Sequence, residues 1–377
     1  MSDLTEARLI IAASETDADL FYITGFLAPD PFIFVQIGSE KYLLMSDLER
    51  DRARSQARVD HVLALSHYQE QAKKSGIENP SSIDALHHLL IENNIKRLNV
   101  PRTFPIATAD NLRERGYEIG FPDGVYWPER ELKTQSEVAH IREAQQHTEA
   151  SMDAAINLIR DSEIRDDILY HNNEPLTSEI VKRSIQYTLM EHSCTPSHTI
   201  VACGDQACDP HNEGSGPLHA HQAIIIDIFP RSDLTGYFAD ITRTVVKGEP
   251  TAELQDIYDT VLKGQTLALE QICAGADGQD IHKTIVDLFE SRNYKTGTVD
   301  GRMQGYFHGT GHGVGLEIHE APRISKVTDI LRPGHVVTVE PGLYYPQRGA
   351  VRIEDLVVVT EDGCDNLTTY PNFLTVD

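Results

Sequence analysis

A run of histidine and glycine between residues 308 and 320 has the residue types best suited to chemistry. It reads HGTGHGVGLEIHE, and its histidines are His308, His312 and His319. Glycine has no Cβ, so the backbone beside these imidazoles can bend tightly and approach a ligand or a metal closely. Such a segment would be costly as ordinary scaffold. We therefore predict that it lines a functional site.

Four carboxylates in strand-like segments are the expected partners of these histidines. They are Asp227 in IIIDIFP, Asp240 in GYFADITRT, Glu340 in VTVEPGLY and Glu354 in VRIEDLVV. Side chains alternate between the two faces of a strand, so Asp227 shares a face with bulky apolar groups. The turn at 230–233 predicts a hairpin in which Asp227 and Asp240 converge.

Burying several like charges costs several kcal/mol each unless a cation compensates them. One arginine, Arg352, cannot neutralise four carboxylates, whereas a pair of divalent ions can. Oxygen ligands with one or two histidines suit Mn²⁺, Co²⁺, Fe²⁺ or Zn²⁺ rather than a thiolate site. Two such ions ~3.5–4 Å apart can activate a water molecule and hold a substrate oxygen. The residues thus predict a dinuclear metal centre.

Composition excludes several classes of partner. The chain has 377 residues, which favours two domains. Its net charge of −25 argues against nucleic-acid binding, which needs a basic surface. No apolar run reaches the ~18 residues of a membrane span, and we expect neither a membrane partner nor a signal peptide. Five cysteines, an odd number in a large chain, favour reduced thiols and a cytoplasmic location.

Residues 1–125 alternate strand-like and helix-like segments and predict a small α/β domain. Strands are expected at 8–13, 32–38, 61–65 and 95–101, and helices at 46–57, 81–94 and 108–116. The segment 121–130 contains two prolines and a glycine, so we interpret it as a linker. The second domain is then 126–377.

The second domain reads as two similar halves. The capping box at Thr134–Glu137 predicts a helix start, and a second helix is expected at 178–190. Strands should follow at 198–204, 223–229 and 236–248. The order then repeats, with helices after Pro250 and at 280–292 and strands at 335–341 and 350–360. This predicts an α+β domain in which a cleft between two pseudo-repeated halves takes ligands from each.

Five segments of the sequence resemble those of a known family. The patterns around His211, GYFADITRT, HGTGHGVGLEIHE, TVEPGLY and VRIEDLVVVT are similar to those of the pita-bread metallopeptidases. They look most like prolidase and aminopeptidase P, which cut the peptide bond before proline. The resemblance covers about residues 126–377, and all five motifs follow the family order. Residues 1–125 resemble the family's smaller, creatinase-N-like domain in length, in α/β character and in FYITGF at 21–26.

The resemblance assigns a role to each site residue. It implies the metal ligands Asp227, Asp240, His312, Glu340 and Glu354, of which Asp240 and Glu354 bridge two ions. It also implies three catalytic residues: His211 and His319, which would steady the tetrahedral intermediate, and Glu340, which would shuttle a proton. His308, His319, Tyr344 and Arg352 match residues that bind the substrate or orient the site. One departure is the spacing of the two aspartates, 13 residues instead of the usual 11. The extra residues fall in the turn that starts at 230.

The resemblance therefore implies hydrolysis of Xaa-Pro bonds in small peptides by a metal-bridging hydroxide. Manganese is the first choice of metal, with cobalt, zinc and iron as alternatives, and a homodimer is expected. The short first domain favours a dipeptidase over an aminopeptidase. Two alternatives stay open: an amidohydrolase of this fold that acts on another small N-acyl or cyclic compound, and a non-catalytic binding protein.

Overall fold

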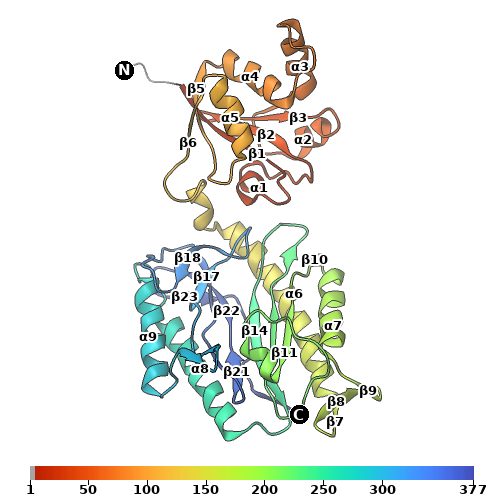
Figure 1. The fold of residues 1–377 in the computed structure, drawn as a ribbon, viewed down its shortest axis with the longest axis vertical. Coiled ribbons are helices and arrows are strands. Elements are labelled where there is room, and N and C mark those ends of the chain that lie inside the picture. The colour runs from red at the N-terminus through yellow and green to blue at the C-terminus, as the bar shows by residue number, and fades with distance from the viewer. Residues whose placement is uncertain (1–4) are drawn as a thin grey trace. The chain divides into compact units, whose positions relative to one another are not determined.

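The computed structural model describes residues 5–377, and the chain forms two compact units that divide between Arg130 and Glu131 (Figure 1). The expected boundary lay five residues earlier, after residue 125. The division falls later because Tyr126 and Trp127 pack in the core of the first unit. The Tyr126 hydroxyl donates to Asn99 O at 2.8 Å, and Trp127 packs edge-on against Phe34.

The first unit contains a six-stranded mixed sheet in the order β4-β3-β2-β1-β5-β6. The strands are β1 (Thr5–Ala12), β2 (Phe32–Ile37), β3 (Glu40–Met45), β4 (His61–Ala64), β5 (Ile95–Asn99) and β6 (Glu118–Gly120). The helices are α1 (Ala18–Thr24), α2 (Arg50–Gln56), α3 (Leu65–Lys74), α4 (Ser82–Glu92) and α5 (Ile106–Glu114). The sequence predicted four of these strands and the helices α2, α4 and α5. It missed α1, α3, β3 and β6.

Four long helices frame the second unit. The pair α6 (Gln135–Arg160) and α7 (Ser178–Glu191) belongs to the first half, and α8 (Ala252–Gln271) and α9 (Gly278–Ser291) to the second. Figure 1 shows one pair on each side of the strands. The predicted capping box starts α6, because Glu137 accepts from Thr134 N at 2.7 Å and Thr134 Oγ1 accepts from Glu137 N at 3.3 Å.

Each half contributes a largely antiparallel sheet, as predicted. The first runs β11 (Ile200–Cys203), β12 (Ile224–Ile228), β14 (Ile241–Lys247) and β24 (Thr375–Val376). The second runs β18 (Glu320–Ile324), β17 (Gly311–Gly313), β19 (Val336–Val339), β22 (Asp355–Val359) and β23 (Cys364–Asn366). Each half also has its own apolar core.

Short strands complete the second unit. They are β7 (Glu163–Arg165), β8 (Ile168–His171) and β9 (Glu174–Pro175), β10 (Cys194–Thr195) with β13 (Arg231–Ser232), β15 (Gly297–Val299) with β16 (Arg302–Gln304), and β20 (Gly342–Tyr345) with β21 (Gly349–Arg352). Across residues 5–377, none of the helices combines the length and apolar character that crossing a bilayer requires.

Two predicted strands are interrupted at the carboxylates. The segment 350–360 is not one strand, because β21 pairs with β20 whereas β22 pairs with β19 and β23. Glu354 lies in the break between them. The hairpin of β12 and β14 is confirmed, but β14 begins only at Ile241, so Thr242 rather than Asp240 lies opposite Asp227. Asp240 and Glu354 therefore sit at strand ends, where backbone groups need partners outside the ladders.

Candidate metal centre

A cavity of about 950 Å³ in the second unit collects almost all the predicted site residues. Both halves contribute to its wall. The predicted residues on the wall are His211, Asp227, Asp240, His308, His312, His319, Glu340, Arg352 and Glu354. This volume lies in the range of small-molecule binding pockets and is larger than the volume that two metal ions occupy.

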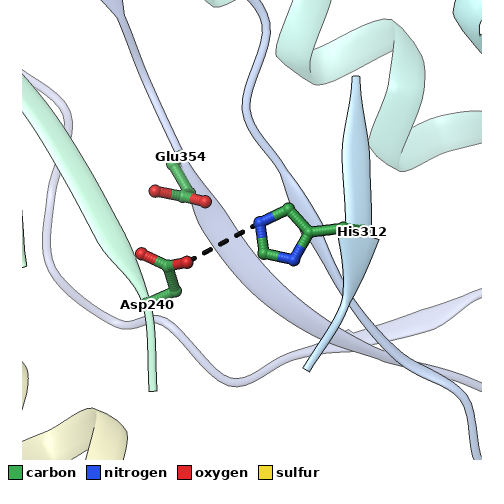
Figure 2. Close-up of side chains that lie close together, drawn as sticks. All are labelled: Asp240, His312 and Glu354. Carbon is green, nitrogen blue, oxygen red and sulfur yellow. Dashed lines mark ion pairs between the residues drawn. The ribbon is translucent and has the colours of Figure 1, made fainter. Parts of the chain in front are cut away.

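Three side chains form the centre of the cavity wall. One ligand atom each from Asp240, His312 and Glu354 lies within 4.8 Å of the other two, and all three residues are buried. Figure 2 shows them pointing toward one another from three separate segments. His312 Nε2 is 3.8 Å from Asp240 Oδ2. Thus the start of β14, the strand β17 and the break before β22 meet at one point.

The other two predicted ligands lie beside this centre. Glu340, directly after β19, places Oε1 3.4 Å from His312 Nε2. Asp227 on β12 accepts a hydrogen bond from Arg352 Nη2 at 2.6 Å through Oδ2. Asp227 Oδ1 and Asp240 Oδ1 are buried and accept no hydrogen bond from residues 5–377. Buried oxygens without a donor are costly, and a cation would satisfy both.

Electrostatics at the centre also favour a cation. Burial, followed by the charges of Glu354, Asp227 and Glu340, raises the pKa of Asp240 well above its usual range. Burial is also the main cause that raises the pKa of Glu354 well above its usual range and that of Glu340 to about 7. The protein alone therefore cannot hold all these carboxylates ionised at neutral pH. Carboxylate oxygens with one imidazole are donors that suit hard or borderline divalent ions, so the residues fit a metal site.

The imidazole of His312 presents the correct nitrogen. Its Nδ1 lies 3.1 Å from Gly313 O, which can only accept, so Nδ1 carries the proton. Nε2 then offers its lone pair toward Asp240 and Glu340. Burial lowers the pKa of His312 to about 3, which keeps this ring neutral and available as a ligand.

The glycines beside His312 are required by close backbone contacts. A Cβ on Gly311 would lie 1.9 Å from Thr338 O, and one on Gly313 would lie 2.2 Å from Ala321 O. Larger residues would push β17 away from its neighbours and move His312. The Gly-His pattern of the sequence therefore reflects tight strand packing around a ligand.

A hydrogen-bond chain supports the opposite side of the cavity. Arg352, buried beside Asp227, donates from Nη1 to the Tyr344 hydroxyl at 3.0 Å. That hydroxyl lies 2.9 Å from His308 Nε2, and His308 Nδ1 lies 2.8 Å from Gly309 O. Nδ1 of His308 is thus the donor, and Nε2 accepts from Tyr344. Tyr344, predicted to bind substrate, is fully buried and does not line the cavity; it contacts the wall residues His308, Arg352 and Phe307 instead.

Two histidines on the wall are open to solvent. His319 is exposed and lies edge-on to His312, with ring centroids 4.3 Å apart. His211 is exposed as well and lies in the loop that follows β11. Both can therefore contact a bound molecule directly, and the catalytic roles of both stay predictions.

Several wall residues were missed by sequence reasoning. Arg323 on β18 is exposed, lies opposite His312 in the strand register, and brings a guanidinium to the cavity. Phe307 and Ile318 add apolar surface near His308 and His319. In the sequence, Arg323 is distinguished only by its position four residues after His319. That spacing does not indicate a shared site until the pairing of β17 with β18 is known.

Residues 139–361 match the model of metallopeptidase family M24. The Xaa-Pro dipeptidase of Pyrococcus furiosus is 28% identical over 357 residues, which cover 93% of this chain and 90% of that protein.

Solved structures show the same fold. An X-Pro aminopeptidase from Thermotoga maritima superposes with a TM-score of 0.82 at 24% identity, over 99% of this chain and 98% of that one. An Xaa-Pro dipeptidase from Bacillus anthracis gives 0.82 at 25% identity, over 98% and 94%. The chain therefore belongs to metallopeptidase family M24, and it is a hydrolase with the pita-bread fold of the prolidase and aminopeptidase P branch.

Proposed function

We propose that the chain is an Xaa-Pro peptidase that uses two divalent ions, held by Asp227, Asp240, His312, Glu340 and Glu354. The observation that carries the proposal is the convergence of these five side chains on one cavity, with two buried carboxylate oxygens that lack donors. When bound, the ions supply Lewis acidity for the scissile carbonyl and lower the pKa of a water molecule.

Glu340 is our candidate for proton transfer. Its side chain is only one-fifth exposed, and its Oε1 lies 3.4 Å from His312 Nε2, so the carboxylate lies beside the proposed ions and their bound water. It can accept a proton from the attacking water and deliver it to the leaving proline nitrogen. His211 and His319, which are both exposed in the cavity, can donate hydrogen bonds to the oxygen that gains negative charge.

The shape and charge of the wall support a short peptide ending in proline. Phe307 and Ile318 provide an apolar surface for the ring, and His308 lies beside them. A dipeptide carries its carboxylate directly on the proline, and an exposed arginine pairs well with a carboxylate. Arg323 is such an arginine, so we propose a dipeptidase rather than an aminopeptidase.

Hydrolysis of Ala-Pro, Ala-Ala and Ala-Pro-Ala by metal-loaded protein tests the proposal. We expect Ala-Pro to be cut fastest and Ala-Ala to remain intact. Asp240→Asn should lower the rate by about 100-fold or more, because it removes a ligand. The exposed Asp259→Asn on α8 is the matched control and should keep full activity.

Full activity of Asp240→Asn would contradict the metal centre. Metal binding without hydrolysis of any Xaa-Pro peptide would favour the amidohydrolase alternative. The number of ions and the choice of manganese remain predictions that elemental analysis of purified protein can test. Light scattering can test the predicted homodimer.

A further inference from the structure

Two buried polar side chains, Gln145 on α6 and Arg243 on β14, lie behind the metal centre and bond to the segment 367–371. Gln145 is fully buried and Arg243 is 2% exposed. Neither side chain lines the cavity, and neither has a role in the proposed chemistry. Burying polar groups of this kind costs free energy unless hydrogen bonds compensate for the lost water.

Arg243 uses all five of its N–H donors. Nη1 donates to Glu354 O at 2.6 Å and to Thr242 O at 3.0 Å. Nη2 donates to Asp355 Oδ1 at 2.9 Å and to Tyr370 O at 2.5 Å, and Nε donates to Pro371 O at 3.2 Å. One guanidinium therefore joins the strand break that carries Glu354 to the backbone of residues 370 and 371.

Gln145 makes the equivalent link for Asp240. Its Oε1 accepts from Asp240 N at 3.1 Å, and its Nε2 donates to Thr368 Oγ1 at 3.0 Å. Thr368 Oγ1 also accepts from Leu356 N at 2.9 Å, two residues beyond Glu354. The backbone of Asp240 and the strand β22 are thus connected through the same segment.

These links matter because Asp240 and Glu354 lie outside regular strand pairing. Asp240 comes from the first half of the unit and Glu354 from the second, so no single sheet sets their separation. Thr242 adds direct bonds to Glu354: Thr242 Oγ1 donates to Glu354 Oε2 at 2.7 Å, and Thr242 O accepts from Glu354 N at 3.0 Å. The remaining freedom of the two ligands is restrained by Gln145 and Arg243.

We propose that Gln145 and Arg243 are positioning residues that hold Asp240 and Glu354 at the separation that metal binding needs, with the segment 367–371 as their common anchor. The inference rests on the proposed function, because it takes both carboxylates as metal ligands. Residues that orient ligands commonly change metal affinity by about 10- to 100-fold when they are replaced. The same loss is expected here without loss of the fold.

Titration calorimetry with Co²⁺ on metal-stripped full-length protein tests the inference, with circular dichroism to monitor folding. Arg243→Lys keeps the positive charge but cannot reach five acceptors, and Gln145→Leu removes both links. We expect each variant to bind Co²⁺ about 10- to 100-fold more weakly at 25 °C while still folded. Thr368→Val, which removes the anchor of Gln145, should give a similar loss.

Lys247→Met is the matched control, because Lys247 lies on the same strand and its Nζ donates to Arg160 O at 2.7 Å. It should lower the melting temperature but keep the Co²⁺ affinity. Unchanged affinity in Arg243→Lys and Gln145→Leu, or an equal loss in Lys247→Met, would overturn the inference. If Arg243→Lys does not fold, Gln145→Leu and Thr368→Val decide by the same criteria.

Glu354→Gln separates this inference from the proposed function. If Glu354→Gln binds Co²⁺ more weakly but Arg243→Lys and Gln145→Leu do not, the metal centre is supported and the positioning role is wrong. If the unmutated protein binds no Co²⁺ at all, the metal centre and this inference both fall.

Discussion

The carboxylate cluster predicts an unusual effect of Glu340→Gln on stability. In metal-free protein this substitution should stabilise the fold at pH 8 and leave it almost unchanged at pH 4.5. Most substitutions of buried residues lower the free energy of unfolding, so an increase here would be a stringent test of the electrostatic account. It follows from the cost of ionising Glu340 beside other buried carboxylates without a cation.

The magnitude follows from the raised pKa of Glu340. Folding moves that pKa from 4.5 to about 7, because burial disfavours the charged form. The folded state therefore binds the proton more tightly, and ionisation opposes folding as the pH rises from 4.5 to 7. A shift of about 2.5 units at 1.36 kcal/mol per unit gives a penalty of about 3 kcal/mol above pH 7. This is an upper value, since solvent reaches one-fifth of the side chain.

Urea denaturation at pH 4.5, 6, 7 and 8 measures the effect, with both proteins stripped of metal. Four histidines have lowered pKa values, the buried His282, His312 and His335 and the half-buried His308. They make the fold less stable toward acid, but both proteins contain them. The difference in free energy of unfolding between the variant and the unmutated protein therefore isolates Glu340.

The exposed Glu270→Gln on α8 is the control and should change stability by less than about 0.5 kcal/mol at every pH. After loading with metal, the sign for Glu340→Gln should reverse, because a ligand is lost. A difference for Glu340→Gln that stays flat between pH 4.5 and 8 in metal-free protein would refute the electrostatic account of the site.

Three further substitutions test how the site is held. Gly313→Ala should cost about 1–3 kcal/mol in urea denaturation and weaken metal binding, because its Cβ would meet Ala321 O at 2.2 Å; unchanged metal affinity would contradict this. Lys133→Met should cost about 1.5–3 kcal/mol of unfolding free energy, because it removes the buried ammonium that pairs with Glu320. The double variant with Glu320→Leu should recover much of that loss, and no recovery would show that the two side chains are not coupled. Thr134→Ala should lower stability by about 1 kcal/mol through loss of the α6 cap, and thermal unfolding that matches the unmutated protein would exclude that role.

Local sequence patterns predicted the second unit well. The stripe along α6, the capping box at Thr134 and the hairpin around Asp227 all depend on residues close in the chain, so periodicity reveals them. The first unit was predicted less completely. There, α1 and β3 were missed at seven and six residues, but α2 and β2 have the same lengths and were predicted, so length alone does not explain the difference.

The boundary between the two units was predicted after residue 125 instead of after Arg130, and the reason for this difference is another one. Tyr126 and Trp127 lie in a segment rich in proline and glycine, which indicates a linker. Their aromatic rings nevertheless pack in the first core, next to Phe34. Composition predicts the backbone conformation of such a segment. Burial of its side chains depends on an apolar core formed by residues distant in the sequence.

The sequence by itself determined the types of the predicted ligands, their order and the family to which the chain belongs. Only the tertiary structure decided that strand pairing stops at Asp240 and Glu354, that Arg323 lines the cavity, and that Arg243 donates hydrogen bonds to Glu354 O and Tyr370 O. These features depend on which strands become neighbours, since β21 and β22 join different sheets although they are consecutive in the chain. Pairing between distant segments is set by the free energy of the whole packed unit, and local alternation of side chains does not encode it.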